Sequence, residues 1–253
     1  MDEFADYYSI QTTNRVVFQK NFASDIAVFK VLLSRLREIW GRVGTLRGLT
    51  GHSHVGLLPF SNLLVRHLIF GFEHLSSYQS FLAWLTFRPG LEALLIIGKF
   101  VDDVANAKTW REREVNPKAY RQEFSGSALE SKSLPRSADF RQVLTHLNDE
   151  FMHPNPAFTY RDTTVKTDAA GHLIEIQFFD VSANLHEAHL LAYLNLMDNI
   201  VAASDSLVAA LCGPTGVAAS ARTDEPKERN RAVQLAKDAT AKKVMQELGL
   251  WTL

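Results

Sequence analysis

The chain has 253 residues, 27 basic and 28 acidic side chains with a formal net charge of −1, and 46% hydrophobic residues. This is the composition of an ordinary globular protein, and it excludes wholesale disorder and a uniformly basic nucleic-acid coat, although not a local basic face. A single cysteine, Cys212, excludes an internal disulfide framework, as expected in a reducing compartment.

Targeting and membrane signals are weak along the chain. Residues 1–6 are acidic and lack the basic region and apolar core of a secretion signal. Charged residues interrupt every apolar run before it reaches the ~18 residues of a membrane-spanning helix. We therefore expect a cytoplasmic protein with no membrane partner.

The first half of the chain carries a helical pattern. Apolar residues separated by three or four positions predict a helix over 15–40, and glycines then predict a loop over 41–59, closed by Pro59. A second helix is expected over 61–87 with Ser61 as its N-cap and a break at Gly71 or at Ser76-Ser77. Pro89 is expected to begin a further helix that reaches about Val104 and lies centrally in the core.

The second half combines helices with one β signal. Helices are predicted over 103–123, interrupted by Pro117, and over 137–153, where Pro154 and Pro156 stop the helix. The apolar period then changes to two around a turn at 168–171, which predicts a β-hairpin near residues 163–178 with Ile174, Ile176 and Phe178 on its buried face. The expected fold class is mainly α, a helical bundle with one inserted β-hairpin.

The C-terminal region completes the predicted domain organisation. A helix over 184–211 belongs to a bundle that spans 1–212, a linker rich in small residues follows over 213–226, and residues 227–253 carry a basic amphipathic helix. The basic side of that helix comprises Lys227, Arg229, Arg231, Lys237, Lys242 and Lys243.

The catalytic and metal motifs in the sequence are incomplete. The segment 51–56 resembles a nucleophile elbow, but its second glycine comes one residue late and no strand precedes it. A phosphate-binding glycine loop is absent from the sequence. The histidines lack the paired glutamates or cysteines of a metal centre, so we expect neither metal nor cofactor.

Two polar patterns remain as candidate sites. Arg88 and Glu92 are one helical turn apart on an apolar helix, so their side chains can meet, either as a structural ion pair or in a polar pocket. On the helix 137–153, Arg141 and Asn148 share one flank, whereas His146 and His153 fall together opposite the apolar stripe. Those histidines either face solvent or face a partner subunit.

This helix resembles a known family. Arg141 and His146 form an Arg-x4-His motif similar to that of HEPN domains, the nucleotide-binding domains of higher eukaryotes and prokaryotes. The later segment 147–155, with Asn148, Asp149 and His153, resembles the helix end of a bacterial HEPN-like family, and Phe87–Glu92 is similar to the Arg-Pro-x-x-Glu helix of that family. The likeness covers about residues 60–210.

The resemblance implies a helical bundle that often dimerises. In active HEPN members, arginine and histidine from both subunits form a metal-independent RNase site. Two departures argue against cleavage here: Gln142 follows Arg141 where a smaller polar residue is common, and Asn148 takes the arginine position if His153 is the equivalent histidine. Asparagine cannot supply the charge.

Three functional hypotheses follow. The first is a non-catalytic HEPN-like protein, a homo-oligomer that binds a partner, nucleotide or RNA through Arg88, Glu92, Asn148, Asp149 and His153. The second is a metal-independent endoribonuclease of a defence or toxin type that uses Arg141 and His146. The third is a helical scaffold or metal-binding protein.

Overall fold

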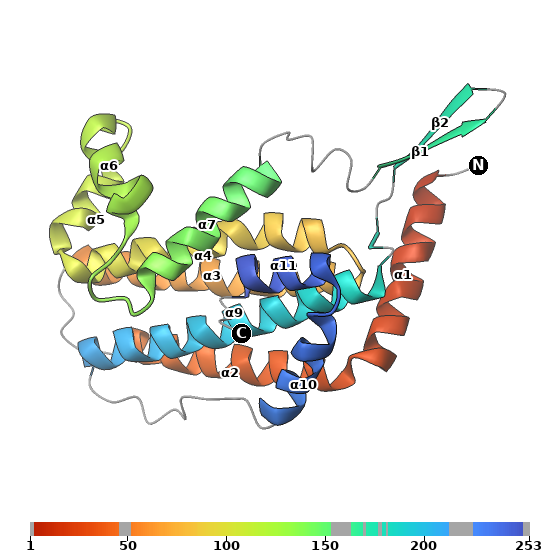
Figure 1. Cartoon of the computed structure of the whole chain (residues 1–253). Helices are drawn as coiled ribbons and strands as arrows, with labels where there is room; N and C mark the ends of the chain where they lie inside the picture. The colour runs from red at the N-terminus through yellow and green to blue at the C-terminus, as the bar shows by residue number, and fades with distance from the viewer. Residues whose placement is uncertain are drawn as a thin grey trace.

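A computed structural model describes residues 3–45, 52–152, 163–168, 171–176, 179–180, 182–212 and 225–249. The chain is mainly helical, as the sequence predicts, and its long helices pack around one large apolar core (Figure 1). The predicted 213–226 linker falls almost wholly outside the described residues, as do Phe178 and the side chains of Ile174 and Ile176.

The predicted single helix over 15–40 is two helices. Helix α1 spans Glu3–Asn21 and α2 spans Ala23–Thr45. Hydrogen bonds continue on both sides of the junction, from Phe22 N–H to Phe18 carbonyl (2.9 Å) and from Ile26 N–H to Phe22 carbonyl (3.0 Å). The apolar period therefore runs through the junction unbroken and hides it, while Figure 1 shows α1 turning away from α2 at that point.

Helices α3 and α4 form a long antiparallel pair. Helix α3 spans His52–Ser76 and α4 spans Ser80–Asp102, so the expected break at Ser76-Ser77 is confirmed. The predicted loop over 41–59 is wrong from His52 onwards, because Pro59 lies inside α3. Ser61 is not an N-cap but a buried helical residue, and its hydroxyl donates to the Leu58 carbonyl at 2.9 Å.

Pro89 lies inside α4 and does not begin it. Proline removes one helical hydrogen bond and usually ends a helix. In the preceding turn, Nδ1 of His67 on α3 lies 2.6 Å from the Thr86 carbonyl oxygen and joins the two helices. Glycine at position 90 allows the close approach of the two helices, because a Cβ there would lie 2.9 Å from the Cβ of His67.

Short helices cover one end of this pair. Helix α5 spans Val104–Arg111 and α6 spans Pro117–Phe124, so Pro117 divides the predicted 103–123 segment, as expected. A 3₁₀ turn, η1, covers Gly126–Leu129. The carboxylate of Asp103 accepts from Ala105 N–H at 2.8 Å, which fixes where α5 begins.

The predicted helix over 137–153 changes its geometry before it ends. Helix α7 spans Ser137–Leu147, and a π-helical turn, η2, follows over Asn148–Met152. A π turn widens the helix and rotates the side chains that follow it. The N–H of Asn148 still bonds to the Leu144 carbonyl as in an α-helix, so the angular positions expected for a regular helix fail only beyond Asn148.

A two-stranded segment precedes the longest helix. Strand β1 (Thr163–Asp168) pairs antiparallel with β2 (Gly171–Ile176), with Asp168 opposite Gly171. Helix α9 then spans Ala183–Cys212 and packs against α2. The described hairpin lies at the same end of the molecule as α1 (Figure 1).

The predicted C-terminal helix over 227–248 is two helices. Helix α10 spans Glu225–Leu235 and α11 spans Ala239–Leu248. Asp238 begins α11 by accepting from Thr240 N–H (2.9 Å) and Ala241 N–H (3.2 Å). Helix α11 packs on α9 and α7, and Arg231 of α10 pairs with Glu187 of α9 and with Asp25 of α2.

By length and composition, α4 and α9 are long and apolar enough to cross a membrane. Within the bundle, however, 61% and 56% of their apolar windows are buried by other helices. Core helices of many proteins share these properties, so this observation is weak evidence of a membrane span, and the expected cytoplasmic location stays a prediction.

Candidate binding site

Three residues singled out in the sequence meet between α4 and the π turn. Arg88 donates through Nε to Asn148 Oδ1 (2.5 Å) and through Nη1 to Glu92 Oε2 (3.1 Å). The predicted contact between Arg88 and Glu92 is thereby confirmed. Asn148 is the first residue of the π turn, so the change of helix geometry lies beside the site.

The Arg88 cluster, formed by Arg88, Glu92 and Asn148, is only partly buried. The side chains of Arg88 and Glu92 keep 24% and 34% of their exposure. Burial raises the pKa of the Tyr120 phenol, and the negative charge of nearby Glu92 raises it further against the opposing effect of Arg113. A fixed guanidinium at the surface with a phenol nearby can bind an anionic or hydrogen-bonding ligand.

His67 lies on the α3 side of the same helix. Burial lowers the pKa of its imidazole, the hydrogen bond to the Thr86 carbonyl opposes this change, and the positive charge of Arg66 lowers the pKa further. The sequence left open a polar pocket around Arg88 and Glu92. His67 reaches the backbone of α4 one turn before Gly90, where it ties α3 to α4.

The two motif residues of α7 have separate partners. Arg141 donates through Nε to Glu130, which follows η1. His146 places Nε2 at 3.6 Å from Glu247 Oε2 on α11. Their side chains are 31% and 21% exposed, and each is held by a carboxylate from a different part of the chain. The histidine predicted to face solvent or a second subunit therefore contacts α11 of its own chain.

The remaining predicted site residues add little to this geometry. Asp149 is exposed on the π turn, next to Asn148. His153 lies outside the described residues, so the arrangement of the Asn-x4-His pair stays a prediction. Within the described ranges, no group of three or more His, Cys, Asp or Glu side chains is placed to hold a metal ion.

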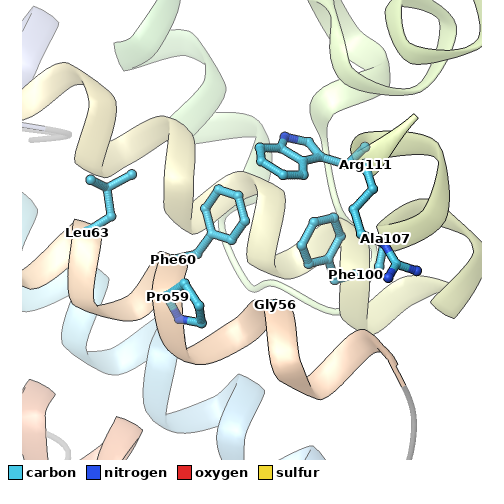
Figure 2. Close-up of a pocket in the computed structure, with 8 residues that line it drawn as sticks. Gly56, Pro59, Phe60, Leu63, Phe100, Ala107 and Arg111 are labelled. Atoms are coloured by element: carbon cyan, nitrogen blue, oxygen red, sulfur yellow. The ribbon is translucent and has the colours of Figure 1, made fainter. Parts of the chain in front are cut away.

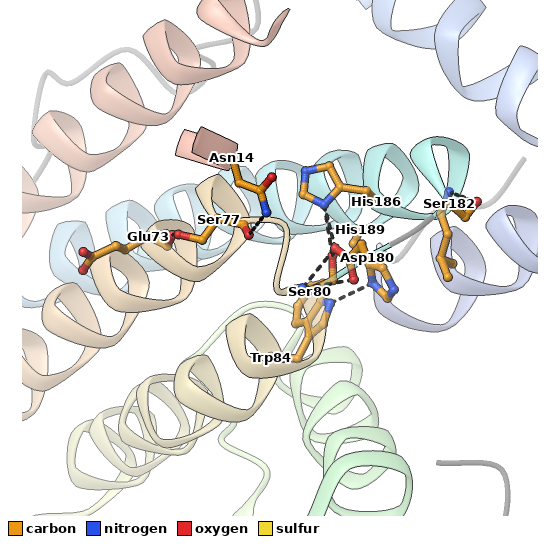
Figure 3. Close-up of polar contacts among 10 residues, drawn as sticks. Asn14, Glu73, Ser77, Ser80, Trp84, Asp180, Ser182, His186 and His189 are labelled. Atoms are coloured by element: carbon orange, nitrogen blue, oxygen red, sulfur yellow. Dashed lines mark hydrogen bonds and ion pairs between the residues drawn. The ribbon is translucent and has the colours of Figure 1, made fainter. Parts of the chain in front are cut away.

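A buried polar network that the sequence did not reveal lies where α4 begins (Figure 3). Asp180 Oδ2 accepts from the Ser80 hydroxyl (2.5 Å) and from the Ser80 amide N–H (3.1 Å), and lies 2.8 Å from His186 Nδ1. Nearby, Trp84 donates through Nε1 to Nδ1 of His189 at 2.9 Å.

These residue types are those of a Ser-His-Asp triad, but the roles differ. Ser80 and His186 are both 0% exposed, and the Ser80 hydroxyl donates its hydrogen bond to the Asp180 carboxylate. A nucleophile needs access to substrate and a base that takes its proton. The network instead gives α4 the N-terminal cap that the side chain of Gln79 does not supply.

Comparison of the whole chain with protein-family models, with curated proteins and with solved structures finds no match. The geometry of the described residues is therefore what supports a function. The sequence indicated Arg88, Glu92 and Asn148 as candidate residues, but it did not pair Asn148 with Arg88, which lies 60 positions away in the chain. Asp180 gave no signal, because Ser80, which donates two hydrogen bonds to its carboxylate, lies 100 positions away in the chain.

Proposed function

We propose that this chain is a non-catalytic helical protein that binds RNA or a nucleotide by placing a phosphate against Arg88. The observation that carries the proposal is the guanidinium itself: Asn148 accepts from Nε and Glu92 accepts from Nη1, and neither bond uses Nη2. A guanidinium held at the surface loses little freedom when it binds a phosphate oxygen.

The absence of catalysis is supported by the partners of Arg141 and His146. An RNase site needs arginine and histidine to act on one scissile phosphate. Here Glu130 and Glu247 draw the two side chains to different parts of the chain. We also propose that the chain is HEPN-like and forms a homo-oligomer. If RNA does not bind, the alternative partner is a protein.

A binding experiment distinguishes the proposed site from a structural ion pair. We expect the wild-type protein to shift a mixed single-stranded RNA in a gel, with affinity that falls as salt rises. Arg88→Met should weaken binding ~10-fold, because it removes a charge-assisted contact to phosphate. Glu92→Gln should strengthen binding several-fold, because it removes the competing negative charge.

Two outcomes would overturn this proposal. If Glu92→Gln only destabilises the fold and leaves RNA binding unchanged, the Arg88 cluster is structural. If substitution of Lys242 and Lys243 to Ala, on the exposed face of α11, removes binding while Arg88→Met does not, the basic C-terminal helix is the nucleic-acid surface.

The endoribonuclease hypothesis is tested with the same material. In EDTA, we expect the folded wild-type protein to leave the RNA intact. Cleavage that disappears in both Arg141→Ala and His146→Ala would support the catalytic alternative and reject the non-catalytic one.

A further inference from the structure

A mostly apolar cavity of about 460 Å³ lies between α3, α4 and α5, away from the Arg88 cluster. Its walls include Gly56 and Phe60 of α3, Phe100 of α4, and Ala107, Trp110 and Arg111 of α5. Figure 2 shows Phe60 and Phe100 on neighbouring sides of the cavity and Arg111 on the α5 side. The volume lies within the ~300–1,000 Å³ range of small-molecule pockets.

The aromatic walls hold one another in place. The ring of Phe60 meets Phe100 edge to face at 5.5 Å between centroids, and meets Trp110 in the same way at 5.0 Å. The guanidinium of Arg113 covers one face of Trp110 at 4.2 Å from the ring centroid. A cavity with walls fixed in this way is formed before a ligand arrives, which lowers the cost of binding.

Gly56 contributes to the shape of the cavity. Glycine inside a helix is less stable than alanine by ~1 kcal/mol. A Cβ at this position would lie 3.1 Å from Cε2 of Phe100, which is closer than ordinary van der Waals contact. The glycine therefore lets the Phe100 ring lie directly against α3.

One charge stands at the edge of this apolar space. Arg111 is exposed, and among the described residues no carboxylate forms an ion pair with it. The other basic residues of this segment differ: Lys108 lies 3.9 Å from Glu112, and Arg113 lies on Trp110. Arg111 is thus available to an anion whose body occupies the cavity.

From these observations we propose that the cavity binds a small amphipathic carboxylate. The carboxylate would pair with Arg111, and an aliphatic or aromatic body would lie against Phe60, Phe100 and Trp110. A nucleobase fits less well, because a base presents hydrogen-bonding edges and the lining is almost entirely apolar apart from Arg111. The site is independent of the Arg88 cluster, since twelve helical residues, or ~18 Å, separate Arg88 from Phe100 along α4.

Isothermal titration calorimetry with three probes tests this proposal: decanoate, 4-phenylbutyrate and the neutral 4-phenylbutanol. We expect saturable binding of at least one carboxylate, and binding of the alcohol that is weaker by ~10-fold or more, because the alcohol lacks the charge-assisted contact. The two carboxylates distinguish an aliphatic from an aromatic body.

Variants locate the site. Ala107→Leu should abolish binding by filling the cavity, and Arg111→Ala should reduce the affinity for the carboxylate to that for the alcohol. Lys108→Ala removes the same charge outside the lining, and should leave binding unchanged. Thermal unfolding of each variant identifies those that fail to fold, and Arg111→Ala, at an exposed position, keeps the test available if Ala107→Leu does not fold.

The proposal is overturned if neither carboxylate binds the wild-type protein. It is also overturned if the carboxylates bind folded Ala107→Leu and folded Arg111→Ala as tightly as they bind wild type. Binding of the alcohol as tightly as the carboxylates would also reject it, because Arg111 would then contribute nothing. None of these outcomes changes the RNA-binding test of Arg88, so the two sites succeed or fail separately.

Discussion

Asp180 joins three parts of the chain through one carboxylate. Its oxygens receive the Ser80 amide and hydroxyl at the start of α4 and lie beside Nδ1 of His186 in α9. Its own backbone N–H donates to the Tyr78 carbonyl at 2.6 Å. Burial by itself would raise the pKa of Asp180, but the contacts with His186, with His189 and with Ser80 outweigh burial, and the pKa lies below its usual value.

Replacement of Asp180 by asparagine should destabilise the fold by ~2–3 kcal/mol, because buried hydrogen bonds to a charged acceptor are lost. Asp6→Asn, on the exposed side of α1, is the matched control and should leave the free energy of unfolding unchanged. Urea unfolding near neutral pH measures both. Equal stability of the two variants would show that the charge of Asp180 contributes nothing.

Wild type and Asp180→Asn should also differ in how their stability depends on pH. Because the folded-state pKa of Asp180 is lowered, its stabilising contribution is complete above the ordinary value of 3.8 and is lost as the pH falls through the lower folded-state pKa. The difference in unfolding free energy between wild type and Asp180→Asn should therefore shrink as the pH falls below 3.8. A difference that grows in acid would contradict this assignment.

At the scale of helices and strands, local sequence signals predicted some helix ends correctly, but they also predicted ends at prolines that lie inside helices. Ser76-Ser77 ends α3 and Pro117 begins α6, as the sequence suggested. Pro59 and Pro89 lie inside helices, because packing between α3 and α4 outweighs the lost hydrogen bonds. The contact between Arg88 and Asn148 was not expected, because it joins two helical segments 60 positions apart in the chain.

One arginine ties helix α10 to α2 and α9, beside the apolar contacts of Ala232 and Leu235. Asp25 is only 8% exposed and pairs with Arg231 at 2.7 Å, and the guanidinium also binds Glu187 and lies 5.6 Å from the centre of the Phe22 ring. Burial lowers the pKa of Arg231, but the two carboxylates outweigh this effect and keep the pKa raised.

Arg231→Met should destabilise the protein by ~3 kcal/mol, because it leaves the buried charge of Asp25 without a partner. Arg229→Met, at an exposed position of the same helix, should have almost no effect. Thermal or urea unfolding compares the two. If Asp25→Asn restores the stability of Arg231→Met, the unpaired carboxylate is the cause of the loss.

For the whole molecule, the sequence predicted the class of fold but not the places where distant segments meet. Apolar periodicity is a local property, and it indicated a mainly helical chain. The cavity is different: Phe60, Phe100 and Trp110 each look like ordinary core residues, and only the packing of α3, α4 and α5 brings their rings together. The ion pair between Asp25 and Arg231 joins residues 206 positions apart, beyond the reach of any spacing rule.

The antiparallel pair of α3 and α4 has a consequence for the order of folding. The two helices are joined by the short turn around Tyr78, so their contacts close only a small loop. The contacts of Ser80 with Asp180 and of Asp25 with Arg231 join residues far apart in the chain, so we expect them to form later. We expect Leu64→Ala, in the core of α3, to slow refolding with a φ-value of ~0.5–0.8, and Arg231→Met to speed unfolding with a φ-value near ~0. Stopped-flow refolding and unfolding in urea measures both values. The reverse order would mean that the two ends of the chain meet before its most local helical pair is formed.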